Sequence, residues 1–188
     1  MSRITRYDPN MSGASSAVPV HDSIVVATTA SEYDTFAALV REYWDWLLVR
    51  YTDHPGLMEG IGTHQGLQDE LNAVATVYGP PQGKALLAVR DGQVCGAVAY
   101  RDLHDGSCEM KRMFVPERFQ GHGTGRLLCE ALIAAASDDG FRQMRLDTGY
   151  LNVEAMRMYE SMGFSPCQPY RDYPPEVLPH LRFMERPL

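Results

Sequence analysis

A glycine-rich hexapeptide is the segment whose residue types most directly suggest chemistry. Residues 120–125 read Gln-Gly-His-Gly-Thr-Gly and lie between a strand-like run, 108–115, and an amphipathic helical run, 126–139. Glycines at alternate positions let the backbone turn with its N–H groups pointing inward, and a following helix adds its unpaired first-turn donors and the positive end of its dipole. The pattern therefore predicts a binding site for a polyanion such as a pyrophosphate.

Two common phosphate-binding loops fit these residues poorly. A Walker loop ends in Gly-Lys-Ser or Gly-Lys-Thr, whereas this loop continues as Gly125-Arg126-Leu127. A dinucleotide-binding fold gains some support from Asp147, which follows Gly125 by 22 positions at a strand end, where such folds place a ribose-binding acid. However, residues 116–120 separate the glycines from the preceding strand, where that fold needs a tight turn. An NAD-dependent oxidoreductase therefore stays a remote alternative.

The elements that must position the loop begin with a short β-branched run at 24–27, which predicts a strand. Ser31 is the expected N-cap of a long helix, and residues 53–66, with four glycines, are expected to form an irregular connection over a site. A second helix is predicted at 68–77, ended by Gly79-Pro80-Pro81. The long helix carries apolar residues at helical spacing: Phe36, Leu39, Val40, Tyr43, Leu47 and Leu48.

The remaining chain alternates strand and helix patterns. Strands at 85–89 and 94–100 flank the hairpin signal Asp91-Gly92, and a third strand, 108–115, leads to the glycine loop. The segments that follow the helix after the loop are a strand at 141–148, a helix at 154–162 and a closing strand at 181–185. This order predicts an α/β (mixed α+β) fold with a single central mixed sheet, partly antiparallel and partly parallel.

Composition limits the classes of protein to consider. The chain has 188 residues, 45% of them hydrophobic, so one domain at 23–188 after a flexible arm at 1–22 is expected. No apolar run has the length of a membrane span or signal peptide, which predicts a cytoplasmic protein without membrane contact. A net charge of -7 argues against a nucleic-acid partner. Four scattered cysteines without Cys-x-x-Cys predict no metal site, and Cys129 is expected in the core.

The segments on both sides of the loop resemble the GNAT superfamily of N-acetyltransferases, over roughly residues 24–188. Four pieces occur in the family's order: the strand 109–115, the loop Gln120-x-x-Gly123-x-Gly125, Asn152 before a helix, and the stretch 155–164, which fits Ala-x-x-x-Tyr-x-x-x-Gly-Phe. The resemblance implies an antiparallel N-terminal half of the sheet, a parallel pair splayed at strands 4 and 5, and about four flanking helices. It also implies acetyl-CoA as the acyl donor substrate and a primary amine of a small molecule or peptide as the acceptor, without a metal.

The resemblance assigns residues to the cofactor. The pantetheine arm is expected along the fourth strand and the pyrophosphate in the loop. The residues that would bind the cofactor are Met113, Phe114, Val115, Gln120, Gly121, His122, Gly123, Thr124, Gly125, Arg126, Asn152 and Tyr159. Arg118, His122 and Arg126 would add positive charge, or be solvated surface residues. Asn152 could equally cap its helix.

The same resemblance suggests how the reaction proceeds. Glu109 is the candidate base that removes a proton from the amine through a water, because alkyl amines titrate near 10 and stay charged at neutral pH; otherwise it is an ordinary strand residue exposed to solvent. Tyr159 is the candidate acid at the departing sulfur, although it also falls on the apolar face of its helix. A backbone N–H near Met113 would stabilise the developing oxyanion. Cys129 is not favoured as an acyl carrier, since it has no evident histidine partner.

The acceptor is the least determined part. Candidate residues for its pocket are Tyr43, Trp44, Trp46, Tyr170 and Tyr173, with Arg41, Glu42 and Asp45 for a charged substrate or as a solvated helix face. The acidic balance mildly favours a cationic acceptor. A catalytically silent acyl-CoA-binding or regulatory module on the same fold is the alternative function, and a homodimer is left open.

Overall fold

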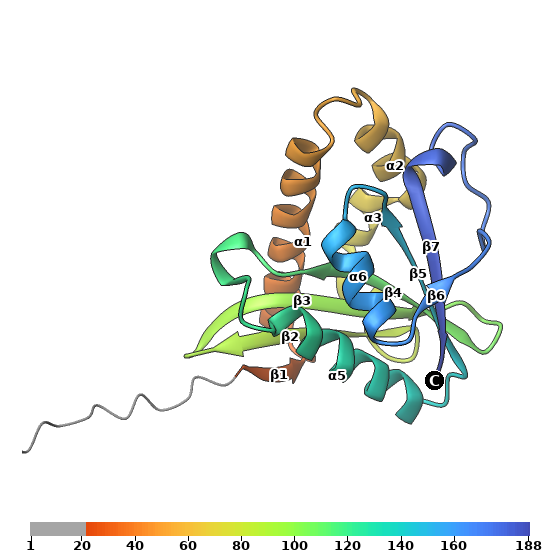
Figure 1. Ribbon diagram of the computed structural model, residues 1–188. Coiled ribbons are helices and arrows are strands. Elements are labelled where there is room, and N and C mark those ends of the chain that lie inside the picture. The colour runs from red at the N-terminus through yellow and green to blue at the C-terminus, as the bar shows by residue number, and fades with distance from the viewer. Residues whose placement is uncertain (1–21) are drawn as a thin grey trace, which may run out of the picture.

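The fold is built on one seven-stranded mixed sheet. The computed structural model describes residues 22–188, so the predicted arm at 1–22 lies outside the described residues apart from Asp22. The strands are β1 (Ser23–Val26), β2 (Gly83–Arg90), β3 (Gln93–Asp102), β4 (Ser107–Phe114), β5 (Gln143–Gly149), β6 (Ser165–Pro166) and β7 (Leu181–Pro187). Their order is β1-β2-β3-β4-β5-β7-β6, with β4 and β5 parallel and all other neighbours antiparallel. The predicted mixed sheet is confirmed (Figure 1).

The described residues contain six α-helices instead of about four. They are α1 (Ala30–Arg50), α2 (Leu57–Gln65), α3 (Leu67–Asn72), α4 (Val74–Tyr78), α5 (Thr124–Asp138) and α6 (Val153–Ser161). The loop predicted at 53–66 is wrong because α2 occupies most of it, and the single helix predicted at 68–77 is instead α3 and α4. Glycine weakens a helix, but Met58 and Ile61 of α2 are buried, and this packing outweighs the propensity. A Cβ at Gly62 would lie 2.9 Å from the Trp44 ring, so this glycine lets α2 approach α1 closely.

The start of α1 also differs from the expectation. Its N-cap is Thr29 and not Ser31. The Thr29 hydroxyl accepts a hydrogen bond from the Glu32 N–H, and the Glu32 carboxylate accepts one from the Thr29 N–H at 2.8 Å, which makes a capping box. These hydrogen bonds, with those from Thr28, lower the pKa of Glu32 to about 2. The Thr-x-x-Glu pattern in the sequence is the signal that identifies this cap.

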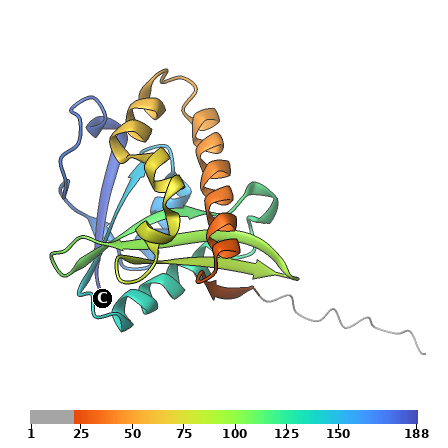
Figure 2. The same cartoon turned by 180° about the vertical axis from the view of Figure 1, so that it is seen from behind.

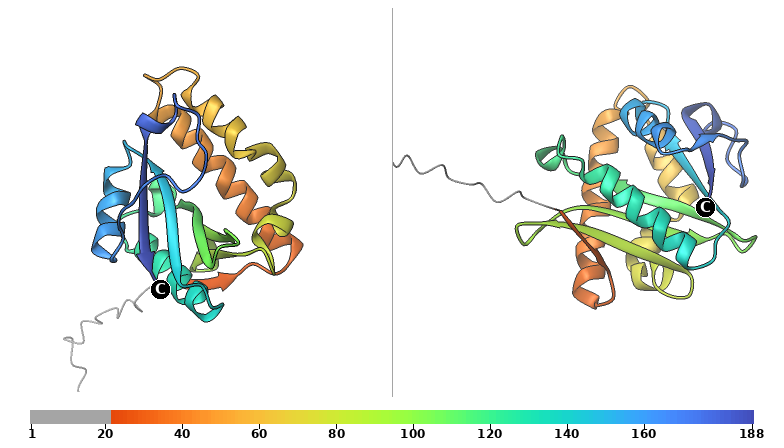
Figure 3. Two further views of the ribbon diagram at one scale, coloured as in Figure 1. Left: turned by 90° about the vertical axis from the view of Figure 1, so that its right-hand side faces the viewer. Right: turned by 60° about the horizontal axis from the view of Figure 1, so that its bottom comes forward.

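The helices cover both faces of the sheet, and the alternation along β2 shows why. Leu86 packs with Leu128 of α5 in one core cluster, whereas its neighbour Leu87 packs with Phe36 of α1 in another. Successive strand residues point to opposite faces, so both faces of β2 are buried. Figure 2 and the right panel of Figure 3 show α1 to α4 on one side of the strands and α5 on the other.

The site depends on the way β4 and β5 separate. The two strands pair only over the register from Ser107↔Gln143 to Glu109↔Arg145, and beyond it they diverge, as Figure 1 shows. A β-bulge interrupts the β3–β4 pairing between Ala97 and Ala99, where Arg112 adopts a left-handed φ of 58°. The carboxyl-terminal half of β4 therefore has one edge without a strand partner among the described residues.

Candidate active site

Two cavities lie where β4 and β5 have separated. The first, called the loop cavity, lies between the second half of β4, the glycine loop 120–125 and α6, and its volume is about 520 Å³. The second, called the helix cavity, lies between α1, α2, β4 and β5, and its volume is about 70 Å³. Among their lining residues, the two cavities share four: Tyr43, Met113, Thr148 and Tyr159. The two cavities therefore meet at these residues.

The glycine loop presents backbone donors to the loop cavity. Gly121 and Gly123 have φ values of 82° and 85°, a conformation that side chains with a Cβ rarely adopt. Gly123 is the N-cap of α5, and it supplies no side-chain hydrogen bond to the first turn. The N–H groups at the start of this 15-residue helix therefore remain available to an anion. Of the predicted loop residues, Gln120, Gly121, Gly123, Thr124 and Gly125 line the cavity.

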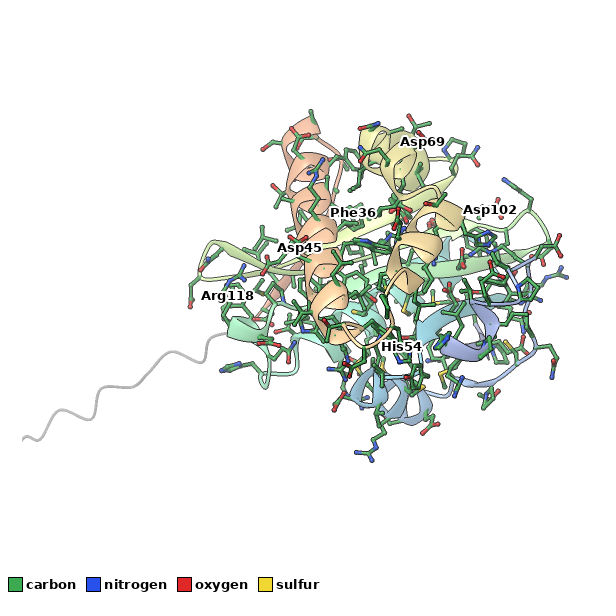
Figure 4. The ribbon with its side chains drawn as sticks, turned by 90° about the horizontal axis from the view of Figure 1, so that it is seen from above. Phe36, Asp45, His54, Asp69, Asp102 and Arg118 are labelled. Carbon is green, nitrogen blue, oxygen red and sulfur yellow. The ribbon has the colours of Figure 1, made fainter. Side chains whose placement is uncertain are left out.

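The predicted cationic side chains do not gather at this loop. His122 is exposed and its Nδ1 lies 2.7 Å from the Gln120 carbonyl oxygen, and neither His122 nor Arg126 lines the cavity. Arg126 instead donates to the Ser161 hydroxyl at 2.6 Å. Arg118 is ion-paired with Glu42 of α1; Figure 4 shows Arg118 at the periphery of the molecule. Within the glycine loop, the positive end of α5 is thus the main attraction for an anion; among the described residues, the cation that does line the cavity is Arg50 of α1, which is ion-paired with Glu154.

Two residues distant in sequence hold the loop in place. The Asp22 carboxylate accepts hydrogen bonds from Arg90 Nε at 2.6 Å and from the Thr124 hydroxyl at 2.5 Å. The hydrogen bonds from Arg90 are the largest of the effects that lower the pKa of Asp22. This contact ties the first residue of α5 to the segment before β1, and no local sequence pattern signals it.

The strand β4 supplies the opposite wall of the loop cavity. Met113, Phe114 and Val115 all line it, as expected for an extended chain that would run along this strand. Because β4 and β5 no longer pair at these positions, this edge has backbone groups open to a ligand, although the Val115 carbonyl accepts a hydrogen bond from Gln120 Nε2 at 2.9 Å.

Asn152 faces the loop cavity with an unsatisfied acceptor. It precedes α6 but makes no side-chain capping hydrogen bond, so the expectation that it caps the helix is not met. Its Nδ2 donates to the Thr148 hydroxyl at 3.2 Å, while its Oδ1 is buried and has no partner among the described residues. A buried acceptor without a partner is costly, so this oxygen is free to accept a hydrogen bond from a water or a ligand.

Tyr159 lies at the junction of the two cavities. The residue is 5% exposed, and burial raises its pKa well above 10, so the phenol stays protonated at neutral pH. Its ring packs against Phe164, at 5.7 Å between centroids, which holds the side chain in place. Its hydroxyl makes no hydrogen bond to another described residue and is available to a ligand.

Glu109 occupies a different place from the one expected for a base. It is completely buried and lines neither cavity. Arg101 Nε donates to one carboxylate oxygen at 2.7 Å, and the other accepts from the Tyr170 hydroxyl at 2.9 Å and Arg171 Nη2 at 2.5 Å. Because both oxygens are occupied by strong donors, the carboxylate has no free oxygen for a direct contact with the acceptor amine in this arrangement, and its role as a base stays a prediction.

The helix cavity includes only part of the predicted acceptor pocket. Tyr43 and Trp44 line it, whereas Trp46 lines the loop cavity and Tyr170 and Tyr173 line neither. Arg41 and Asp45 are exposed, and Asp45 is visible on α1 in Figure 4. Cys129 is fully buried in the core, as predicted.

Charged residues that the sequence did not single out for this cavity line its wall. Lys111 Nζ donates to Asp147 Oδ1 at 3.2 Å, and both side chains are 5% exposed. Arg112, at the bulge of β4, makes two hydrogen bonds of 2.7 Å to Glu70 of α3. Burial raises the pKa of Asp147 and of Glu70, but the charges and hydrogen bonds of Lys111, Arg171 and Arg112 outweigh it and hold both pKa values below the usual range. A simple alternation of inward and outward residues along β4 does not predict this cluster, because the bulge at Arg112 changes the sheet face toward which the β4 side chains point.

Comparison with known proteins gives a consistent result. The model of the acetyltransferase (GNAT) family matches residues 37–164. An uncharacterised N-acetyltransferase of Schizosaccharomyces pombe is 33% identical over 172 residues, which cover 88% of this chain and 94% of that protein. An IAA acetyltransferase of Azospirillum brasilense is 36% identical over 110 residues, which cover 57% of this chain and 70% of that protein.

Solved structures share the fold. A putative acyl-CoA N-acyltransferase from Klebsiella pneumoniae superposes with a TM-score of 0.66 at 24% identity, covering 89% of this chain and 97% of that one. An N-acetyltransferase from Thermoplasma acidophilum in complex with coenzyme A has a TM-score of 0.65 at 18% identity, covering 88% of this chain and 99% of that one. At these low sequence identities, the similarity to the two structures shows a shared fold. In the part of the chain that the structure describes, no helix is long and apolar enough to cross a bilayer.

Proposed function

Because the chain belongs to the acetyltransferase (GNAT) family, we propose that it moves an acetyl group from acetyl-CoA directly to an amine while both are bound. Members of this family are acyltransferases that use acetyl-CoA as co-substrate. The observation that carries the proposal is the junction of the two cavities at Tyr43, Met113, Thr148 and Tyr159. A donor in one cavity and an acceptor in the other would bring their reacting atoms together there, which removes much of the entropic cost of the reaction.

The residues of the loop cavity fit coenzyme A. Its pyrophosphate needs clustered donors, which the backbone at Gly121, Gly123 and the start of α5 supplies. Its extended pantetheine arm carries amide groups, which suit the open edge of β4 and the unpartnered Oδ1 of Asn152. When bound, acetyl-CoA supplies an electrophilic thioester carbonyl and a sulfur leaving group.

Tyr159 is the proposed hydrogen-bond donor to the departing sulfur. Burial raises its pKa, so it keeps its proton and can donate a hydrogen bond at neutral pH. A thiol titrates near 8.5 and a phenol near 10, so the negative charge is better placed on sulfur than on the phenol until another proton arrives. The donated hydrogen bond therefore stabilises the departing thiolate without requiring the phenol to be ionised.

The carboxylate that faces the acceptor is assigned to Asp147 instead of Glu109. Asp147 lines the helix cavity, and its low pKa makes it a weak base, so it would orient the amine while water carries the proton away. Glu109 lies outside the helix cavity and is ion-paired with Arg101 and Arg171, so its proposed role is to position these two side chains.

Calorimetry with acetyl-CoA and a thiol-release assay with a panel of amines test the proposal together. We expect acetyl-CoA to bind and CoA to appear only when an accepted amine is present. Binding without thiol release from any amine would favour the alternative, a silent acyl-CoA-binding module. Absence of binding at millimolar acetyl-CoA would remove the proposed donor altogether.

A further inference from the structure

The helix cavity combines apolar walls with one charged corner. Its walls include Leu47 and Tyr51 from α1 and Met58 and Ile61 from α2. Its volume of about 70 Å³ corresponds to roughly five to seven waters, at about 10–15 Å³ for each water. The enclosed space therefore suits a small head group, such as an amine and the few atoms next to it.

The charged corner is formed by Lys111 and Asp147, close to the junction with the loop cavity. Each is 5% exposed at its side chain, and Asp147 precedes Thr148, one of the residues that line both cavities. Gln65 Nε2 lies 3.4 Å from Asp147 Oδ2, and Arg112 Nη1 donates to Gln65 Oε1 at 3.1 Å. Arg112 itself is matched by Glu70, so this second pair adds no net charge.

The charges behind this corner do not balance. Glu109 is 0% exposed and meets Arg101 at 2.7 Å, Arg171 at 2.5 Å and Lys111 at 3.8 Å, while Asp147 meets Lys111 at 3.2 Å. In this network, within residues 22–188, three cations face two carboxylates. One positive charge is left over, and Lys111 is the member of the three that lines the helix cavity.

Of the three cations only Lys111 is buried, with 5% of its side chain exposed, whereas Arg101 and Arg171 are 25% and 31% exposed and are partly hydrated. A buried charge costs free energy unless ions of opposite sign compensate it. An acceptor that carries a carboxylate next to its amine would supply such an ion. The same positive excess would disfavour the ammonium form of a nearby amine and so promote the neutral form that reacts. A site of this kind needs no strongly basic side chain, which agrees with the occupied oxygens of Glu109.

We propose that the acceptor is an α-amino acid with an uncharged side chain, whose carboxylate binds Lys111 and whose amine points past Asp147 toward Tyr159. The apolar walls receive the side chain. This inference rests on the proposed function and narrows its acceptor. It runs against the preference for a cationic acceptor drawn from the net charge of -7, because that charge belongs to the whole chain and the local excess is positive. A polyamine would add charge of the wrong sign beside Lys111.

Matched amine pairs test the inference on the unaltered protein. L-alanine, L-serine and L-2-aminobutyrate, whose uncharged side chains are short enough for this cavity, are each compared with their primary amides, with thiol release as the readout and calorimetric binding of CoA as the prior check. The amides have the less basic amines and would react faster without a carboxylate site. We expect kcat/KM to be at least about 10-fold higher for an amino acid than for its amide, the size of one charged hydrogen bond.

A lysine variant locates the preference. Lys111→Met is expected to lower the ratio of kcat/KM for an amino acid to kcat/KM for its amide by about 10-fold or more, and Lys111→Arg is expected to restore part of this ratio. Lys84→Met is the matched control, because Lys84 on β2 is also ion-paired, to Asp139 at 2.6 Å, yet lines neither cavity. The Lys84→Met variant should keep the kcat/KM ratio of the unaltered protein.

The outcomes separate this inference from the function on which it rests. If CoA does not bind, both fail. If CoA binds and the amides are used as well as the amino acids or better, the inference is overturned and acetyl transfer stands. No turnover of any of the three amino acids by protein that binds CoA also overturns it.

Discussion

Tyr159 is the residue at which the donor and acceptor meet in this account. It is buried, protonated at neutral pH and within both cavities. Its position was predicted from the stretch 155–164, since a tyrosine at this spacing before Gly-Phe is a family motif. The partners of Glu109 could not be predicted in this way, because Arg101 and Arg171 come from β3 and from the segment before β7, and no motif at Glu109 indicates them.

Tyr159→Phe removes the hydroxyl and keeps the ring, so packing against Phe164 should persist. We expect kcat to fall by about 100-fold, within the range for a positioned acid, and the Kd for CoA to change by less than about 3-fold. Steady-state kinetics and calorimetry measure the two quantities. A variant with wild-type kcat would exclude a hydrogen bond from Tyr159 to the departing sulfur.

Asn152→Ala tests the unsatisfied oxygen in the loop cavity. If Oδ1 accepts a hydrogen bond from the pantetheine arm, its loss should raise the Kd for CoA by about 3- to 10-fold, which is the net worth of one hydrogen bond. The control is Asn72→Ala, because Asn72 is exposed at the end of α3 and lines neither cavity. Equal CoA affinity in both variants would contradict a ligand contact at Asn152.

At the scale of elements, strands were easier to predict than the helices between 53 and 78. The strands β2 to β5 carry hairpin glycines, β-branched residues and alternation, which are local signals. Helices α2, α3 and α4 are short and contain or adjoin glycine, so they depend on packing against α1, which a single sequence does not display. The bulge at Arg112 depends likewise on a distant residue, Glu70.

The cap of α1 gives an element-scale prediction. Thr29→Ala removes a capping-box hydroxyl and should lower the free energy of unfolding by about 1 kcal/mol. Ser31→Ala is the matched control, since Ser31 lies inside the helix and is exposed, and should change stability by less than about 0.5 kcal/mol. Urea denaturation of both variants decides the point. The reverse order would restore Ser31 as the cap.

At the scale of the whole molecule, buried carboxylates hold the helices to the sheet. Glu70 joins α3 to β4, and Asp22 joins the segment before β1 to α5. Asp147 secures β5 to β4 through its ion pair with Lys111. The site is therefore assembled from contacts between distant segments, which explains why its walls could not be predicted from one motif.

These carboxylates predict loss of stability in acid. Glu70, Asp147 and Asp22 have pKa values lowered in the folded protein, and that of Glu32 is about 2. Such groups stabilise the fold above their unfolded pKa and cease to do so as the pH falls through the folded pKa. We expect the free energy of unfolding to be nearly constant from about pH 6 to 8 and to fall from about pH 4.5 downward.

Urea denaturation across pH measures this trend. Glu70→Gln, which cannot titrate at that position, should show a shallower dependence below about pH 4.5 on a lower overall stability, because it leaves Arg112 less well paired. A free energy of unfolding that stays constant down to pH 3 would show that the buried carboxylates do not govern acid stability.

The central claim is that acetyl-CoA in the loop cavity gives its acetyl group to an amine in the helix cavity. The most direct measurement follows CoA release and the acetylated amine together, by thiol assay and mass spectrometry, with and without added L-amino acids. The account predicts that CoA forms only with an accepted amine, in equal amount to the N-acetylated product. Equal CoA release without any amine, or release with no acetylated product, would contradict it.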